Sequence, residues 1–516
     1  YFKKLGMKRN GLLSESLDDF NLAKGDDISI TGGQEEYAIL GFFYRLNYGY
    51  KDRYLFEASG RYDGSSRFRR GHRFGFFPSF SAGYDIARTP YFQQLALPVS
   101  QLKVRVSYGR LGNQNGAGLY DYIAQMPLDA QGTNAWLLPG ISSSTASKGT
   151  IAKTPKMISP YITWEKVDNA NLGFDLMLLK NRLSITADFY QRTTRDMIGP
   201  AESIPSISGI ASDDRAKVNN ATLRNRGWEL SVSWNDKLKC GFSYGVGFNV
   251  FNYKAVVTKY NNPEGIIYNN HTGLAANKGY YEGMDIGEIW GYVTDRFYRE
   301  DDFNADGTLK EGIPIPKGVY PGDILYKNFD DDASTIWSGK GTADDPGDQR
   351  IIGNSTPRFH YGINAGLSWK GFDLSVFLRG VGKRDFWRTD QIAWPTGTWG
   401  SLFKETLDFW TPEHTDAYFP RVYANNGVNT ASNRWKQTKY LANAAYLKLQ
   451  NITLSYTLPK TWAKQICFDE VKVFFSGENL HTWDHLPEGL ESDMLSKGAW
   501  EYPFMKKFSL GFNVTF

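Results

Sequence analysis

Segments of about ten residues in which apolar and polar side chains alternate recur along the whole chain. The clearest is the last, residues 507–516, whose apolar face carries Phe508, Leu510, Phe512, Val514 and Phe516. A period of two residues over this length predicts a β-strand. The apolar face of such a strand packs in the core of a β-sandwich or lies against lipid in a transmembrane barrel.

About fourteen segments follow this pattern, and each is close to the length that a tilted membrane-spanning strand requires. Their polar faces carry amides, hydroxyls and charges, among them Lys103, Arg105, Asp188, Glu229, Asn364, Asp373 and Arg379. Their apolar faces lie within residues 40–48, 54–62, 74–84, 102–108, 172–178, 183–189, 228–234, 242–250, 361–369, 372–378, 452–458, 471–475 and 508–516. The pattern predicts an all-β fold.

The connections between these segments alternate between short and long. Short turns are expected at residues 49–52, 180–181, 235–237 and 370–371. Long connections are expected at residues 111–160, 194–219, 252–356, 381–443 and 482–505. This alternation puts the short turns at one end of the sheet and the long loops at the other, as in outer-membrane barrels with short periplasmic turns. A compact soluble sandwich gives no reason for loops this long, so a transmembrane antiparallel β-barrel is favoured.

Composition excludes several other classes of protein. Mean hydropathy is −0.45, and no apolar run approaches the roughly 18 residues of a membrane helix, so a helical membrane protein is excluded. Net charge is +4, from 59 basic and 55 acidic residues, which gives no reason to expect a nucleic-acid partner. The two cysteines, Cys240 and Cys467, are far apart and are interpreted as free thiols, with a single bridge as the alternative.

Several stretches resemble the SusC/RagA-type TonB-dependent outer-membrane transporters. The first three are KDRYLFEASGRYDGSSRFRRGHRFGFFPSFSAGYDI at residues 51–86, GDILYKNF at 322–329 and LDFWTPEHTDAYFPR at 407–421. Two more are RIIGNSTPRFHYGINAGLSWKGFDLSVFLRGVG at residues 350–382, and YLKLQNITLSYTLPK followed by VKVFFSGENLHTW within residues 446–483. The final Phe516 is of the kind that the outer-membrane assembly machinery recognises.

The resemblance implies a complete barrel of about 22 strands with an N-terminal plug inside it. Residues 1–516 are then the C-terminal portion of the barrel, and the plug, the TonB box and the first strands are expected upstream. The family imports oligosaccharides or peptides, driven by TonB acting on the plug. A SusD-like surface lipoprotein covers the outer loops as a lid, in a dimer of transporter–lid pairs.

Tryptophans in the connection after residue 381 are the candidates for ligand contact. Trp394 and Trp399 lie in AWPTGTWG, and Trp387 precedes them. Flat indole faces stack on sugar rings, and their N–H groups donate to hydroxyls. The alternative is that these side chains pack the loop against itself or against a lid protein, which is the interpretation preferred for Trp410.

Acidic and amide side chains give a candidate metal site in an outer loop. Asn328, Asp330 and Asp332 alternate, and Asp348 follows at a distance. Ca²⁺ and Mg²⁺ bind several such oxygens together. The resemblance implies a calcium-loop-like run at this place, but here its glycines are missing and an insertion separates the ligands. A solvated loop without a metal is therefore the alternative.

The sequence predicts import of oligosaccharides across the outer membrane with no chemical conversion. It has no Gly-x-Ser-x-Gly elbow and no phosphate-binding loop, so we do not expect an enzyme. Three alternatives stay open: a peptide importer of the same family, a passive porin or adhesin barrel, and a soluble glycan-binding β-protein. An upstream plug and TonB box would separate the active transporter from the passive barrel.

Overall fold

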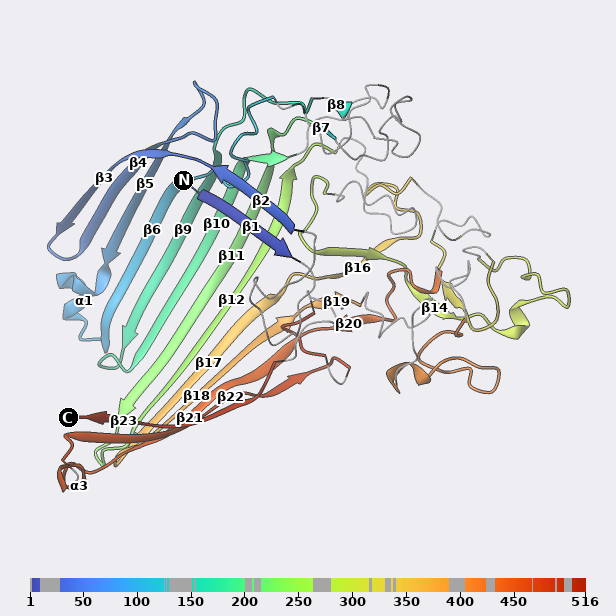
Figure 1. Ribbon diagram of the computed structural model, residues 1–516. Coiled ribbons are helices and arrows are strands. Elements are labelled where there is room, and N and C mark those ends of the chain that lie inside the picture. The colour runs from blue at the N-terminus through green and yellow to red at the C-terminus, as the bar shows by residue number, and fades with distance from the viewer. Residues whose placement is uncertain are drawn as a thin grey trace.

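The protein, described here by a computed structural model, is built mainly from β-strands. Thirteen of them form one antiparallel sheet in the order β3-β4-β5-β6-β9-β10-β11-β12-β17-β18-β21-β22-β23 (Figure 1). The structure describes residues 2–9, 28–124, 126, 128–129, 151–152, 155–199, 207, 215–262, 280–314, 318–329, 336, 340–388, 404–423, 432–465, 467–487, 490–495 and 504–516.

The strands of this sheet fall where the period-two pattern predicts them. They are β3 (Ile39–Tyr50), β4 (Tyr54–Ser65), β5 (Phe74–Asp85), β6 (Val99–Asn113), β9 (Glu165–Leu178), β10 (Leu183–Gly199), β11 (Val218–Lys237), β12 (Ser243–Lys259), β17 (Arg358–Trp369), β18 (Phe372–Lys383), β21 (Tyr446–Thr457), β22 (Glu470–Asp484) and β23 (Lys507–Thr515). Each pairs antiparallel with the next in sheet order, so the all-β prediction is confirmed. Within the described residues, β3 and β23 are the two edges.

The tight turns lie at one end of the sheet and the long loops at the other, as predicted. The end with the tight turns, which we call the turn end, also carries two short helices, α1 (Pro90–Gln94) and α3 (Lys460–Gln465). The long loops lie at the other end (Figure 1). One predicted turn is wrong: residues 235–237 continue β11, and the chain reverses at residues 238–242 instead. The strand is longer because Asn235 to Lys237 still pair with Gly245 to Ser243. In the described residues, no helix has the length and apolar character needed to cross a membrane.

The two faces of the sheet differ in chemistry. One face exposes apolar and aromatic side chains, with Leu510 77% and Phe512 74% exposed on β23. Rings on this face stack across strands, as Tyr54 does on Tyr84 at 5.0 Å between ring centroids. The other face is polar and rich in ion pairs. An apolar face turned outward is the reverse of a soluble sheet and fits contact with lipid.

The long loops form small sheets of their own. The described strands outside the main sheet are β1 (Phe2–Arg9) with β2 (Ile28–Glu35), which precede β3, and in the loops β7 (Leu128–Asp129) with β8 (Ile151–Ala152), β13 (Glu288–Gly291) with β16 (Arg350–Asn354), β14 (Thr294–Phe297) with β15 (Ile324–Tyr326), and β19 (Asp385–Trp387) with β20 (Leu441–Asn443). The last three pairs come from the β12–β17 and β18–β21 connections, which we call the outer-loop assembly. A bridge from Tyr292 to Gln437 joins the two connections.

Candidate functional site

The outer-loop assembly has an apolar core like that of a soluble domain. Three rings at its centre, Tyr292, Tyr326 and Trp435, lie 5.1 to 5.7 Å apart between centroids. The residues that form this core are Tyr292, Ile324, Tyr326, Ile336, Trp387, Phe419 and Tyr440. The two connections are therefore packed against each other by side chains that are about 100 residues apart in sequence, as Tyr326 and Trp435 are.

A buried carboxylate lies beside this core. Asp323 is 0% exposed, and one of its oxygens accepts from the Tyr423 hydroxyl at 2.7 Å and the Asn433 amide at 2.8 Å. Its other oxygen accepts from the Tyr320 backbone N–H at 2.9 Å. Burial raises the pKa of Asp323 above its usual range, although these hydrogen bonds and the charge of Arg421 act in the opposite direction. The assembly thus holds a carboxylate away from water by satisfying both of its oxygens.

Of the predicted ligand-contact residues, the structure describes Trp387 alone. Trp387 is 9% exposed and belongs to the apolar core of the outer-loop assembly. Trp394 and Trp399 lie outside the described residues, so their contact with ligand stays a prediction. Trp410, expected to be structural, is buried and lies beside Gly322, where an added side-chain carbon would meet the Trp410 ring.

Of the four predicted metal ligands, the structure describes Asn328 and Asp348, whereas Asp330 and Asp332 lie outside the described residues. Asp348 is 0% exposed, and its Oδ1 accepts from the Phe329 backbone N–H at 2.6 Å. One of its oxygens thus already fixes the loop. The described part of the chain contains no group of three or more His, Cys, Asp or Glu placed to hold a metal ion. The Ca²⁺ or Mg²⁺ site stays a prediction.

The last outer loop is fastened to the polar face of the sheet by an ion cluster around one buried lysine. The Lys448 side chain is 2% exposed, and its Nζ lies 2.9 Å from Glu491 and 2.8 Å from Asp493. Asp493 also pairs with Arg379 at 2.6 Å and accepts from the Tyr446 hydroxyl. Burial alone would raise the pKa of Asp493, but the Lys448 hydrogen bond and the Lys448 and Arg379 charges hold it below its usual range. We call this cluster the Lys448 latch.

Ion pairs also cross the strands on the polar face. Arg105 of β6 lies 2.8 Å from Asp175 of β9 and 3.2 Å from Asp188 of β10. Asn171 donates to Asp188 at 3.0 Å. Arg105 thus meets opposite charges on the two strands that follow β6 in the sheet, and these pairs help to fix the register.

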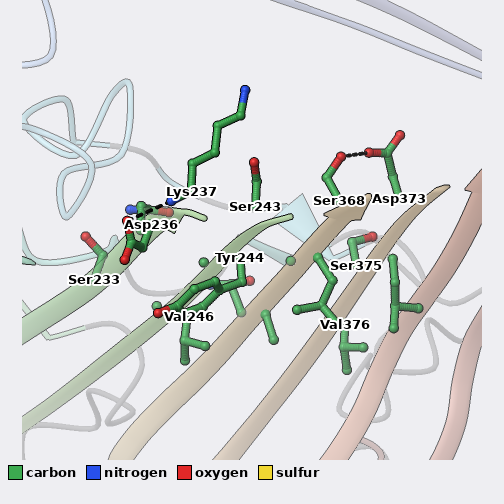
Figure 2. A pocket seen from close by; sticks show the side chains of 18 of the residues that line it. Ser233, Asp236, Lys237, Ser243, Tyr244, Val246, Ser368, Asp373, Ser375 and Val376 are labelled. Carbon is green, nitrogen blue, oxygen red and sulfur yellow. Dashed lines mark hydrogen bonds between the residues drawn. The ribbon is translucent and has the colours of Figure 1, made fainter. Parts of the chain in front are cut away.

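A wide hollow of about 1200 Å³ lies near the turn end of the sheet, over β11, β12, β17 and β18 (Figure 2). Small residues such as Gly247 and Gly366 line it, and an added side-chain carbon would meet nothing within 4 Å at Gly366. Figure 2 shows Ser368 and Asp373 hydrogen bonded at its edge. Because these side chains are short, open space lies above the backbone of the sheet here.

Sequence reasoning missed the Lys448 latch. The period-two pattern places Lys448 and Arg379 on polar faces, so their positions could have been noted. The pattern gives no signal for Asp493, because it lies in a long loop whose path depends on tertiary contacts. The pairing of Arg105 with two carboxylates was likewise invisible, although Arg105 and Asp188 were both expected on the polar face.

Comparisons with known proteins agree with this architecture. The family model "TonB dependent receptor-like, beta-barrel" matches residues 6–480. TonB-dependent receptor P3 of Formosa agariphila is 24% identical over 93% of this chain and 46% of its own length. TonB-dependent receptor SusC of Bacteroides thetaiotaomicron is 23% identical over 83% of this chain and 38% of its own length. The chain thus spans half or less of the length of the curated relatives it matches.

Solved structures share the fold over nearly the whole chain. The RagAB peptide transporter superimposes with a TM-score of 0.73 at 23% identity, covering 98% of this chain and 51% of that one. The RagAB peptide importer in its "open-open" state gives the same TM-score at 25% identity. Proteins of this family are outer-membrane receptors and transporters rather than enzymes. With its family model matched over most of its length, the chain belongs to the TonB-dependent receptor-like β-barrel family and forms part of an outer-membrane barrel.

Proposed function

We propose that the chain is the barrel portion of a SusC/RagA-type transporter that imports oligosaccharides and is energised through TonB. The observation that carries the proposal is the division of the sheet into an exposed apolar face and an ion-paired polar face. A polar wall that carries ion pairs between its strands suits the passage of a hydrated, uncharged solute, because it offers hydrogen bonds with a weaker field than unpaired charges would give. The packed outer-loop assembly supplies a rigid mouth at one end.

The proposed partners follow from the same family. A SusD-like lipoprotein would cover the outer loops, in a dimer of transporter–lid pairs, and TonB would act on a plug outside residues 1–516. An oligosaccharide is favoured as the solute by Trp394 and Trp399, since indole faces stack on sugar rings. A peptide is the second candidate, because the RagAB structures that share this fold are of a peptide transporter.

Binding by the purified full-length protein with its lipoprotein partner tests the substrate class. We expect calorimetry to detect neutral oligosaccharides from a panel that also contains peptides of similar size. The W394A/W399A double variant should weaken that binding by about tenfold or more, since each stacked ring contributes about 1 kcal/mol. Trp462→Ala is the matched control, because Trp462 is 59% exposed on α3 at the turn end. Binding of peptides alone would replace the oligosaccharide proposal with the peptide one.

Uptake by cells separates active transport from a passive barrel. Cells producing the full-length protein should accumulate a fluorescent oligosaccharide, and a protonophore should abolish that accumulation if TonB supplies the energy. Uptake that continues unchanged with the protonophore would support a passive porin instead. The metal prediction has its own test: Ca²⁺ titrated into the full-length protein should give heat that Asp332→Asn removes.

A further inference from the structure

The connection between β4 and β5 is strongly basic. Residues 66–73, SRFRRGHR, contain four arginines and one histidine and no acidic residue. The chain as a whole has nearly equal numbers of basic and acidic residues, 59 and 55. This connection, which we call the arginine loop, is therefore a local concentration of positive charge.

Part of the arginine loop is fixed by its own contacts. Phe68 is 0% exposed in a cluster with Phe77 and Trp164. Arg67 donates to the Ala117 carbonyl at 2.7 Å, and Arg73 donates to the Phe68 carbonyl at 3.0 Å. The loop therefore keeps its shape without any ligand, and two of its four guanidinium groups are already used.

The side chains of the other two arginines have no partner among the residues that the structure describes. Arg69 and Arg70 are exposed, and within the described residues neither side chain has a hydrogen bond or an ion pair. On the polar face of the same sheet, Arg105 pairs with two carboxylates and Arg110 with one. Two adjacent guanidinium groups held on a rigid loop without counter-charges are placed to bind an anion from outside the chain.

The length of the neighbouring strands puts this loop at the membrane boundary. β3, β4 and β5 each have 12 residues, which gives roughly 40 Å along the strand and about 28 Å across the membrane at a 45° tilt. This is close to the thickness of the hydrocarbon core, about 30 Å. β11 has 20 residues and carries its outer loop farther from the membrane. The arginine loop thus lies level with the headgroups.

Aromatic side chains next to the arginine loop support its placement at the depth of the headgroups. Tyr62 and Phe74, the last residues of the apolar row on β4 and β5, stack at 5.1 Å between centroids and are half exposed. Aromatic rings of this kind gather at the interface between lipid tails and headgroups. Arg69 follows Tyr62 by seven residues and Arg70 precedes Phe74 by four, so both lie just beyond the apolar row.

We propose that Arg69 and Arg70 bind the phosphate groups of an anionic glycolipid in the outer leaflet. Guanidinium groups bind phosphate oxygens in bidentate fashion, and phosphate is the dense negative charge at headgroup level. The bound lipid orders the membrane around β3 to β5, on the side of the sheet that includes an edge strand. This site is independent of the transported solute and does not rest on the proposed function.

The test uses the purified full-length protein in detergent and lipid A carrying two phosphates, with binding followed by native mass spectrometry. We expect the R69Q/R70Q variant to bind at least tenfold more weakly than wild type, because each basic residue near an anionic surface contributes about fivefold in affinity. R69K/R70K keeps the charge but loses the bidentate geometry, and should lose about threefold. Dephosphorylated lipid A should bind the wild type as weakly as lipid A binds R69Q/R70Q.

The matched control removes the same charge at the opposite end of the sheet. K237Q/K239Q alters two exposed lysines near the turn at residues 238–242 and should bind lipid A as wild type does. Heat-modifiable gel mobility checks that every variant is folded. Equal binding of lipid A by wild type and R69Q/R70Q, or equal binding of the dephosphorylated lipid, would overturn the proposal. The proposal would also be overturned if R69Q/R70Q bound lipid A as wild type does but no longer bound its lipoprotein partner, since the loop would then be a protein-docking surface.

Discussion

The transmembrane sheet and the outer-loop assembly are stabilised in opposite ways. In the sheet, large apolar side chains such as Phe512 are exposed and charges such as Arg105 are half-buried among carboxylates. In the assembly, Tyr298, Ile324 and Tyr326 are at most 1% exposed, as in a soluble protein. The sheet depends on lipid outside and on a continuous hydrogen-bond ladder between its strands, whereas the assembly depends on its own core. The two regions should therefore unfold independently.

The largest expected effect comes from removing the centre of the outer-loop core. Tyr326→Ala deletes a ring that packs on Tyr292 and Trp435 and a hydroxyl that donates to the Ser432 carbonyl. Such a change should cost the assembly about 3–5 kcal/mol. Trypsin should then cut the outer loops rapidly while the barrel keeps its heat-modifiable mobility. Tyr320→Ala, at a 55% exposed position, is the control and should leave cleavage unchanged. Loss of the folded barrel in Tyr326→Ala would show that the two regions are not independent.

The Lys448 latch joins the sheet to the last outer loop, which lies outside the outer-loop assembly, and breaking it should give the next largest effect. Lys448→Met leaves Glu491 and Asp493 without their shared cation, and the partial exposure of both carboxylates limits the cost to about 2 kcal/mol. Protease Glu-C should cut after Glu491 at least tenfold faster, because the loop opens more often. Lys472→Met breaks a pair with Asp373 whose side chains are 34% and 41% exposed, and should have little effect. Equal cleavage in both variants would mean that the latch does not hold the loop.

The difference between the two regions also explains what could be predicted from sequence. The strands of the sheet can be recognised from a local pattern. Phe508 and Leu510 face lipid while Lys507 and Ser509 face the polar side, and this alternation is visible within about ten residues of sequence. The outer-loop assembly rests on contacts such as Tyr292 with Trp435, 143 residues apart, which no local pattern records. Trp387 shows the consequence. Its residue type suggested ligand contact, which stays a prediction, and no local pattern showed that Trp387 would be buried in the apolar core where β19 pairs with β20.

Acidification should distinguish the Lys448 latch from the outer-loop core, because the pKa values of their carboxylates, Asp493 and Asp323, are shifted in opposite directions. The pKa of Asp493 is held low, so its stabilising contribution is present above its unfolded pKa and is lost as the pH falls below about 4. The pKa of Asp323 is raised by burial, so its ionisation costs stability as the pH rises above about 4, and acid relieves that cost. A nitroxide at Leu490→Cys in a cysteine-free background should gain mobility in acid, and one at Tyr320→Cys should not. Asp493→Asn should make the Leu490→Cys signal independent of pH.

The smallest effect on stability, and the sharpest test of sidedness, concerns the two natural thiols. Cys240 lies in the turn at residues 238–242 and Cys467 in the connection between β21 and β22, so both exposed thiols are at the turn end. A membrane-impermeant maleimide should label neither in intact cells and both once the outer membrane is opened, because short turns face the periplasm. In a Cys240→Ser/Cys467→Ser background, Tyr320→Cys should be labelled in intact cells, since Tyr320 is exposed in the outer-loop assembly. Labelling of Cys240 or Cys467 from outside would reverse the assignment of the two ends and, with it, the side from which the outer-loop assembly receives a solute.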